Sequence, residues 1–129
     1  MDDEFDPDKP IHILLRDSEL LHEITRFLRN YAANIKTFRH INKFMEMPLS
    51  DAPSCLITTL DSSDEHGVSL IKRVQSKGLS IPVIVVATED DNVYSAVKAM
   101  QAGAADFINR PIIERDFIDR LDQVVKKST

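Results

Sequence analysis

Short runs of consecutive apolar residues alternate along this chain with stretches in which apolar residues recur every three or four positions. The short runs predict strands buried on both faces, and the periodic stretches predict amphipathic helices. Such alternation, joined by short connections, predicts an α/β domain with a doubly wound parallel sheet and helices on both faces. The predicted strands are residues 11–15, 34–38, 55–60, 82–87 and 106–109.

Polar residues at the ends of the periodic stretches indicate where helices begin and end. Asp17 or Ser18 is expected to cap the first helix. Residues 88–91 fit a capping box for the fourth helix, which Gly103 is expected to end. The inner face of that fourth helix is predicted to consist of Val93, Ala96, Val97 and Met100.

Length and composition limit the classes of protein to which the chain can belong. Its 129 residues predict one domain over residues 11–127, preceded by a disordered acidic lead-in over residues 1–10. No apolar run is long enough to span a membrane, so a cytoplasmic location is expected. The net charge of −5 argues against direct binding of nucleic acid by this domain. Cys55 is the only cysteine and lies in an apolar strand, which argues against disulfides and thiol chemistry.

The end of the third predicted strand is the expected functional position, because open α/β sheets bind their ligands at the carboxyl ends of strands. Thr59 lies there, followed by a polar loop over residues 61–67. Asp61 and Asp64 in this loop are interpreted as solvated or helix-capping residues. The histidines lack the spacing of metal ligands and are assigned to surface or packing roles; they are His12, His22, His40 and His66.

Residues 96–111, AVKAMQAGAADFINRP, resemble the signature of response-regulator receiver domains, the modules of bacterial two-component signalling. Residues 67–71 and 81–85 match the helix and strand that precede this signature, and the resemblance covers residues 11 to about 126. It implies a flavodoxin-like (βα)5 fold with strand order 2-1-3-4-5. It also implies a signalling module, not an enzyme, to which a sensor histidine kinase transfers a phosphoryl group.

The resemblance also implies where the phosphorylation chemistry should lie. In the family, an aspartate eight residues before the loop glycine accepts the phosphoryl group, and here that position is Thr59. Two acidic residues after the first strand hold Mg²⁺ together with the acceptor. Their positions fall on Leu15 and Arg16, with only the neighbouring Asp17 acidic. Neither aspartyl phosphorylation nor Mg²⁺ binding is therefore expected.

The remaining family positions fall on the last two strands. Counting back from Gly103 places the switch hydroxyl at Thr88, whereas counting forward from Pro82 places it at Ala87. The switch aromatic corresponds to Phe107. The family lysine corresponds to Arg110, which precedes Pro111. A cis Arg110–Pro111 bond is predicted, because it would turn the chain tightly from strand to helix. An ion pair of Arg110 with an acid in residues 61–65 or with Glu89 is also predicted.

Arg16 admits two interpretations. A solvent-facing arginine paired with Asp17 or Asp61 is the more ordinary one. In the other, its guanidinium occupies the vacated cation site beside Arg110 and attracts an anion.

The sequence therefore indicates a degenerate receiver, a pseudo-receiver that acts through contacts with another copy of itself or with an output domain of a transcription regulator absent from this chain. The resemblance places these contacts on the face formed by the fourth helix, fifth strand and fifth helix. That face includes Val93, Tyr94, Lys98, Met100, Gln101 and residues 107–119. Two alternatives stay open: a competent receiver with a displaced acceptor, Asp61 or Asp17, and a sensor of anions or small ligands.

Overall fold

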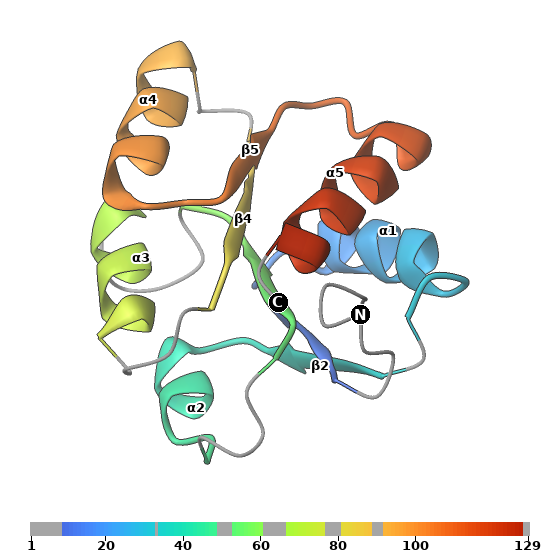
Figure 1. Ribbon diagram of the computed structural model, residues 1–129, viewed down its shortest axis with the longest axis horizontal. Helices are drawn as coiled ribbons and strands as arrows, with labels where there is room; N and C mark the ends of the chain where they lie inside the picture. The colour runs from blue at the N-terminus through green and yellow to red at the C-terminus, as the bar shows by residue number, and fades with distance from the viewer. Residues whose placement is uncertain are drawn as a thin grey trace.

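Five parallel strands alternate with five helices in the computed structural model, which describes residues 9–32, 34–48, 53–60, 67–76, 81–88 and 92–127 (Figure 1). The strands are β1 (Ile11–Leu14), β2 (Ile35–Phe38), β3 (Cys55–Thr58), β4 (Val83–Val86) and β5 (Asp106–Ile108). The helices are α1 (Ser18–Leu28), α2 (Ile41–Met45), α3 (Gly67–Gln75), α4 (Val93–Ala102) and α5 (Glu114–Lys127). None of these helices has the length and apolar character needed to cross a bilayer. The acidic lead-in predicted for residues 1–10 lies largely outside the described residues.

The strands form one sheet in the order β2-β1-β3-β4-β5, which confirms the predicted flavodoxin-like topology. Leu14 of β1 lies beside Thr58 of β3, and Thr58 lies beside Val85 of β4. Every residue of β1, β3 and β4 is buried, because helices cover both faces of the sheet. The edge strand β2 is only partly covered.

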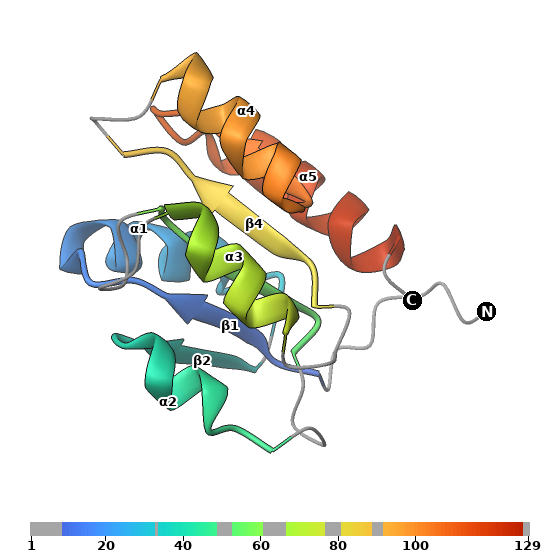
Figure 2. The same ribbon diagram turned by 90° about the vertical axis from the view of Figure 1, so that its left-hand side faces the viewer.

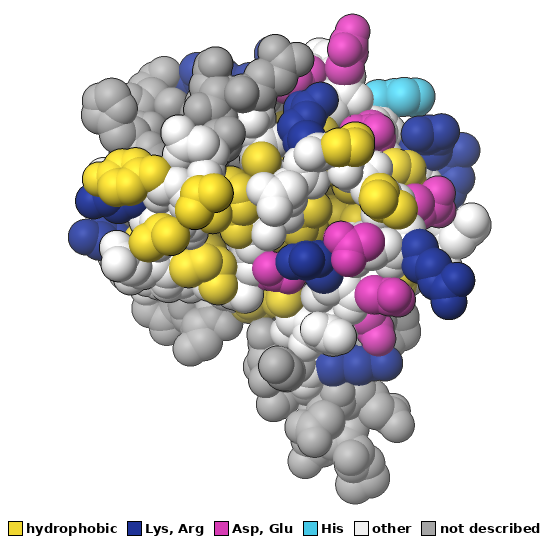
Figure 3. Space-filling view, turned by 90° about the horizontal axis from the view of Figure 1, so that it is seen from above, with side chains coloured by type: hydrophobic (Ala, Val, Ile, Leu, Met, Phe, Trp, Pro, Cys, Tyr) yellow, Lys and Arg dark blue, Asp and Glu magenta, His cyan; other side chains and the backbone are white. Residues whose placement is uncertain are grey.

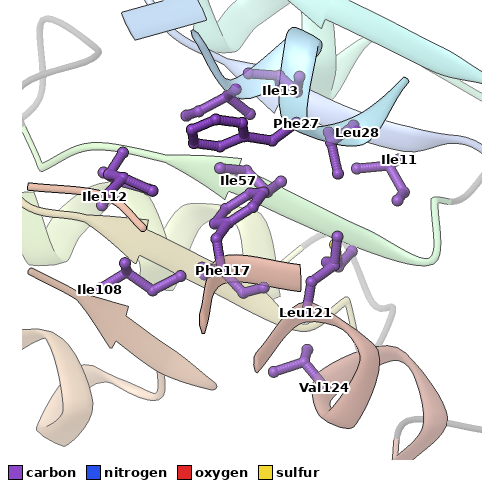
Figure 4. Close-up of a cluster of buried hydrophobic side chains, with 14 of the residues drawn as sticks. Ile11, Ile13, Phe27, Leu28, Ile57, Ile108, Ile112, Phe117, Leu121 and Val124 are labelled. Atoms are coloured by element: carbon purple, nitrogen blue, oxygen red, sulfur yellow. The ribbon is translucent and has the colours of Figure 1, made fainter. Parts of the chain in front are cut away.

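Two hydrophobic clusters hold the helices to the sheet, one on each face. Helices α1 and α5 cover one face, and α2, α3 and α4 cover the other (Figures 1 and 2). The α1/α5 cluster centres on Phe117, whose ring lies 6.1 Å from that of Phe27 (Figure 4). The opposite cluster contains Phe44 of α2 and Ala99 of α4. The alternation of side chains along each strand divides the apolar residues between these two clusters.

The predicted cap of α1 is confirmed, whereas the predicted start of α4 is wrong. Asp17 accepts hydrogen bonds from the backbone N–H groups of Glu19 and Leu20, at 2.9 and 3.2 Å. Helix α4 is capped by a reciprocal pair, Asn92 and Ser95, and not by residues 88–91. The helix begins about one turn later than predicted, because Asn92 caps it there and an asparagine side chain satisfies the exposed amide donors as well as a threonine would. Gly103 ends α4 with a φ of 111°, as predicted.

The inner face of α4 matches the prediction only at Ala96. Ala99 is fully buried, and Ala96 and Ala102 pack against the same cluster. Val93, Val97 and Met100 point outward, with 81%, 47% and 46% of their surface exposed. The methyl side chains of a small-residue stripe let the helix lie close to its neighbours, which leaves no room for larger residues on that side.

A polar contact joins the segment that follows α1 to helix α5 at the edge of their cluster. The Tyr31 hydroxyl donates to Oδ1 of Asp122 at 2.8 Å, and Nζ of Lys126 lies 2.9 Å from Oδ2. The hydrogen bond from Lys126, assisted by that from Tyr31, holds the pKa of Asp122 below its usual value. Burial, together with the hydrogen bond to Asp122, raises the pKa of Tyr31.

We expect Tyr31→Phe to lower the free energy of unfolding at neutral pH by about 1 kcal/mol, because it removes this hydrogen bond. A phenol whose pKa is raised by folding stabilises the fold below its unfolded pKa and loses that contribution as the pH rises above it. The difference between the two proteins should therefore shrink above pH ~10. Urea unfolding at pH 7 and at alkaline pH measures both effects.

Tyr94→Phe is the matched control, because Tyr94 is 67% exposed on α4. It should leave the free energy of unfolding within about 0.5 kcal/mol of the wild type. Equal effects of the two substitutions would contradict the role assigned to the Tyr31–Asp122 hydrogen bond.

Candidate functional site

The candidate site lies at the carboxyl ends of β1, β3 and β4, where the strand arrows in Figure 2 end. The pairing of Leu14 with Thr58 places the next residues, Leu15 and Thr59, side by side. The sheet therefore brings together the predicted acceptor position and the predicted metal-binding positions.

The end of β3 consists of two buried threonines. Thr58 is fully buried, and its hydroxyl donates to the backbone oxygen of Leu14 at 2.8 Å. This bond satisfies a buried hydroxyl and fastens β3 to β1. Thr59 follows with only 3% of its surface exposed. Asp61 and Asp64, the two aspartates of the following loop, lie outside the described residues.

The end of β1 combines an apolar, a cationic and an acidic residue. Leu15 is 1% exposed and packs in the α1/α5 cluster. Arg16 is half-buried. Asp17 is exposed, and its Oδ1 accepts both hydrogen bonds at the start of α1. The only carboxylate among these three residues is thus engaged as a helix cap, as the sequence predicted.

Beyond β4 lie Ala87 and Thr88, the two residues that the sequence offered as the position of the switch hydroxyl. Ala87 is 5% exposed, and its N–H donates to the oxygen of Ile108 at 2.8 Å, so it continues the sheet. Thr88 is half-buried and follows as the first residue beyond that bond. Either residue lies at the same edge as Thr59.

The fifth strand carries the remaining predicted positions. Phe107 is 8% exposed and packs in the α2/α3/α4 cluster. Arg110 is exposed, and its bond to Pro111 is cis, as predicted. The acids proposed as partners of Arg110, in residues 61–65 and at Glu89, lie outside the described residues.

Other titratable residues take packing or surface positions in the described part of the chain. His12 is fully buried and meets the rings of Phe38 and Phe44 edge-on, at 5.1 and 5.8 Å. Burial raises the pKa of the Cys55 thiol, so the reactive thiolate is disfavoured. No three His, Cys, Asp or Glu side chains among the described residues lie close enough to share a metal ion.

A second candidate feature is an exposed apolar patch on α4, and all of its residues except Val97 belong to the predicted contact face. It consists of Val93, Tyr94, Val97 and Met100, with Ile113 before α5, and each is at least 46% exposed. Figure 3 shows hydrophobic side chains gathered on the face that carries α4 and α5. Four residues of the predicted contact segment are buried and contribute nothing to that surface; they are Phe107, Ile108, Ile112 and Phe117.

The sequence did contain a signal for this patch. Alanines at positions 96, 99 and 102 recur every three residues, which is a helix spacing. Such a stripe of small residues indicates close helix packing, and it leaves the larger apolar residues of the same helix to point outward.

Comparisons with known proteins agree on one family. The sequence model of the family described as the response regulator receiver domain matches residues 13–122. The response regulator protein TmoT of Ectopseudomonas mendocina is 26% identical over 121 residues, which are 94% of this chain and 54% of TmoT. The transcriptional regulatory protein CssR of Bacillus subtilis is 26% identical over 88% of this chain and 50% of CssR. The chain thus spans about half the length of the curated relatives it matches.

Solved structures show the same fold. A response regulator receiver protein from Pseudoalteromonas atlantica superposes with a TM-score of 0.78 at 26% identity, over 93% of this chain and 99% of that one. Full-length FixJ from B. japonicum gives a TM-score of 0.82 at 19% identity, over 94% of this chain and 59% of FixJ.

Proposed function

The chain belongs to the response regulator receiver family, and we propose that it is a pseudo-receiver, which accepts no phosphoryl group and acts through contacts with other proteins. Receivers are signalling modules that partner sensor kinases and output domains. The output domain would lie outside this sequence, as the greater length of TmoT and CssR suggests.

The burial of Thr59 beside Leu15 is the observation that carries this proposal. The family transfers a phosphoryl group to an aspartate at this position, which must meet the donor. Thr59 offers a neutral hydroxyl in place of a carboxylate, and only 3% of its surface is exposed. Its neighbour Leu15 is equally covered and apolar.

The residues at this edge do not fit the Mg²⁺ on which the family's chemistry depends. Magnesium binds oxygen ligands and favours carboxylates. Leu15 has no side-chain oxygen, Arg16 is cationic and Oδ1 of Asp17 caps α1. A guanidinium beside the expected metal position repels a divalent cation. No step through the metal is therefore assigned to this chain.

The α4 patch supports the second half of the proposal. A contiguous apolar surface rimmed by polar residues is typical of protein–protein contact sites. Here the patch lies on the α4–β5–α5 face and is bordered by Lys98, whose ammonium lies 5.2 Å from the centre of the Tyr94 ring. We assign this face to a second copy of the chain, since the patch lies on a helix that a two-fold axis can pair with itself.

Incubation with acetyl phosphate and Mg²⁺, followed by intact-mass spectrometry, tests the loss of phosphorylation. We expect the mass to stay unchanged, because no aspartate stands at the acceptor position. A receiver with an aspartate acceptor, treated in parallel, is the positive control. Magnesium alone should also leave the melting temperature unchanged, since only a ligand of the folded state raises it.

A mass increase of one phosphoryl group would contradict the proposal. If Asp61→Asn abolished that increase, the displaced-acceptor alternative would replace it. Loss with Asp17→Asn and not with Asp61→Asn would point to Asp17 instead.

A further inference from the structure

Strand β2 forms one edge of the sheet and leaves half of its backbone groups facing away from β1. The oxygens of Asn34 and Phe38 accept from Ile11 and Leu15 of β1, at 2.9 and 3.1 Å. Alternate residues of a strand direct their backbone groups to opposite sides, so those of Ile35 and Thr37 point outward. None of the backbone hydrogen bonds found between described elements uses these outward groups. An added strand could pair with them.

A shallow depression lies beside this edge on the α1 face of the sheet. Its volume is about 410 Å³, and it is lined by Thr25, Arg29, Ala32, Ile35 and Thr37. Ala32 and Ile35 contribute apolar surface, whereas Arg29 and the threonines contribute polar groups. The residues with outward-facing backbone groups thus also line the depression. A strand added here would place every second side chain in it.

The surroundings of the edge are basic in a chain with an acidic net charge. No Asp or Glu occurs between Glu23 and Glu46. The same segment carries Arg26, Arg29, Lys36, Arg39 and Lys43, all exposed. Of these five cations, only Lys43 takes part in an ion pair found among the described residues, with Glu46 at 3.8 Å.

We propose that the β2 edge binds an extended acidic segment of a partner protein, which adds to the sheet as a sixth strand. Side chains beside Lys36 would lie on the α2 face and would be acidic, because opposite charges on adjacent strands attract. Side chains beside Ile35 and Thr37 would enter the depression and would be small and apolar. Alternating acidic and apolar residues therefore define the segment.

Two other interpretations of the basic edge make different predictions. A lysine on an edge strand can simply prevent strand addition, in which case no peptide binds. A nucleic acid would contact the cations through phosphates but could not pair with the Ile35 and Thr37 backbone groups in strand register. The outward donors and acceptors, spaced as in a strand, favour the peptide.

An eight-residue peptide of alternating glutamate and valine, blocked at both ends, tests the proposal. We expect it to shift the amide resonances of Ile35 and Thr37 and to slow their hydrogen exchange. A lysine–valine peptide of the same length should bind at least about tenfold more weakly, because like charges on adjacent strands repel. A DNA duplex serves as a competing probe.

Two variants separate strand addition from charge attraction. Thr37→Pro removes an outward N–H without removing a bond to β1, and it should weaken binding at least about tenfold. Lys36→Glu, which leaves the backbone intact, should weaken it by a similar factor. Lys98→Glu on α4 is the matched charge reversal and should leave the affinity for the glutamate–valine peptide unchanged.

Three outcomes would overturn the proposal. The first is that the glutamate–valine peptide binds nowhere or shifts only α4. The second is equal binding of the acidic and basic peptides. The third is that DNA shifts the same amides more strongly than the peptide does.

Discussion

Replacing Phe117 by alanine is expected to lower the free energy of unfolding by about 3–5 kcal/mol. The ring is fully buried at the centre of the α1/α5 cluster, between helix α5 and the sheet (Figure 4). Its removal exposes no new surface to water but leaves a cavity lined by Phe27 and its neighbours. Because a domain of this size is stabilised by about 5–15 kcal/mol in total, this is a large fraction. Urea unfolding followed by circular dichroism measures it.

Two further substitutions test whether the loss of stability comes from the cavity at Phe117 and not from the removal of any apolar side chain. Phe117→Leu keeps most of the apolar volume and should cost less than half as much as Phe117→Ala. Ile113→Ala removes a side chain that is 64% exposed, and its effect should stay within about 0.5 kcal/mol. A similar loss for Phe117→Ala and Ile113→Ala would refute the packing of α5 described above.

The layered fold followed from the sequence because its strongest signals are local. Runs such as residues 83–86 are apolar at every position, which suits only a strand buried on both faces. The strand order came from the receiver signature and not from the strands themselves, since apolar runs carry little information on which strand lies beside which.

Helix α4 shows where the pattern misleads. Valine and methionine are more hydrophobic than alanine, so a count of apolar residues assigns Val93, Val97 and Met100 to the core. The buried residue is Ala99, because the helix approaches its neighbours too closely for a larger side chain. Hydrophobicity alone cannot separate a core stripe from a contact surface when both lie on one helix.

The position of the candidate site could be predicted from the sequence, but the degree to which its residues are buried could not. Parallel strands bring their carboxyl ends to one edge, so Leu15 and Thr59 were expected to be close. The near-complete burial of Thr59 depends on how the surrounding elements pack. The depression beside β2 could not be predicted, since it forms between α1 and β2 only when α1 packs on the sheet, which brings Thr25 and Thr37 to the same surface.

The α4 patch is expected to bind a second copy of the chain, and Val97→Glu is expected to abolish that association. Val93, Val97 and Met100 lie four and three residues apart, so they form one outward stripe with Val97 in the middle. A carboxylate in an apolar contact must be desolvated without a partner. A two-fold interface contains the change twice, so a cost of about 1.4 kcal/mol per copy would weaken association about 100-fold.

Sedimentation velocity over a range of concentrations distinguishes the possible outcomes. The wild type should shift from monomer to dimer as its concentration rises, and Val97→Glu should remain monomeric. Ser69→Glu places the same charge at an exposed position of α3 and should dimerise like the wild type. A wild type that is monomeric at all concentrations, or a Val97→Glu variant that dimerises equally well, would show that a second copy does not cover α4. Urea unfolding of Val97→Glu separates lost association from lost folding, because a side chain that is 47% exposed contributes little to the stability of the monomer.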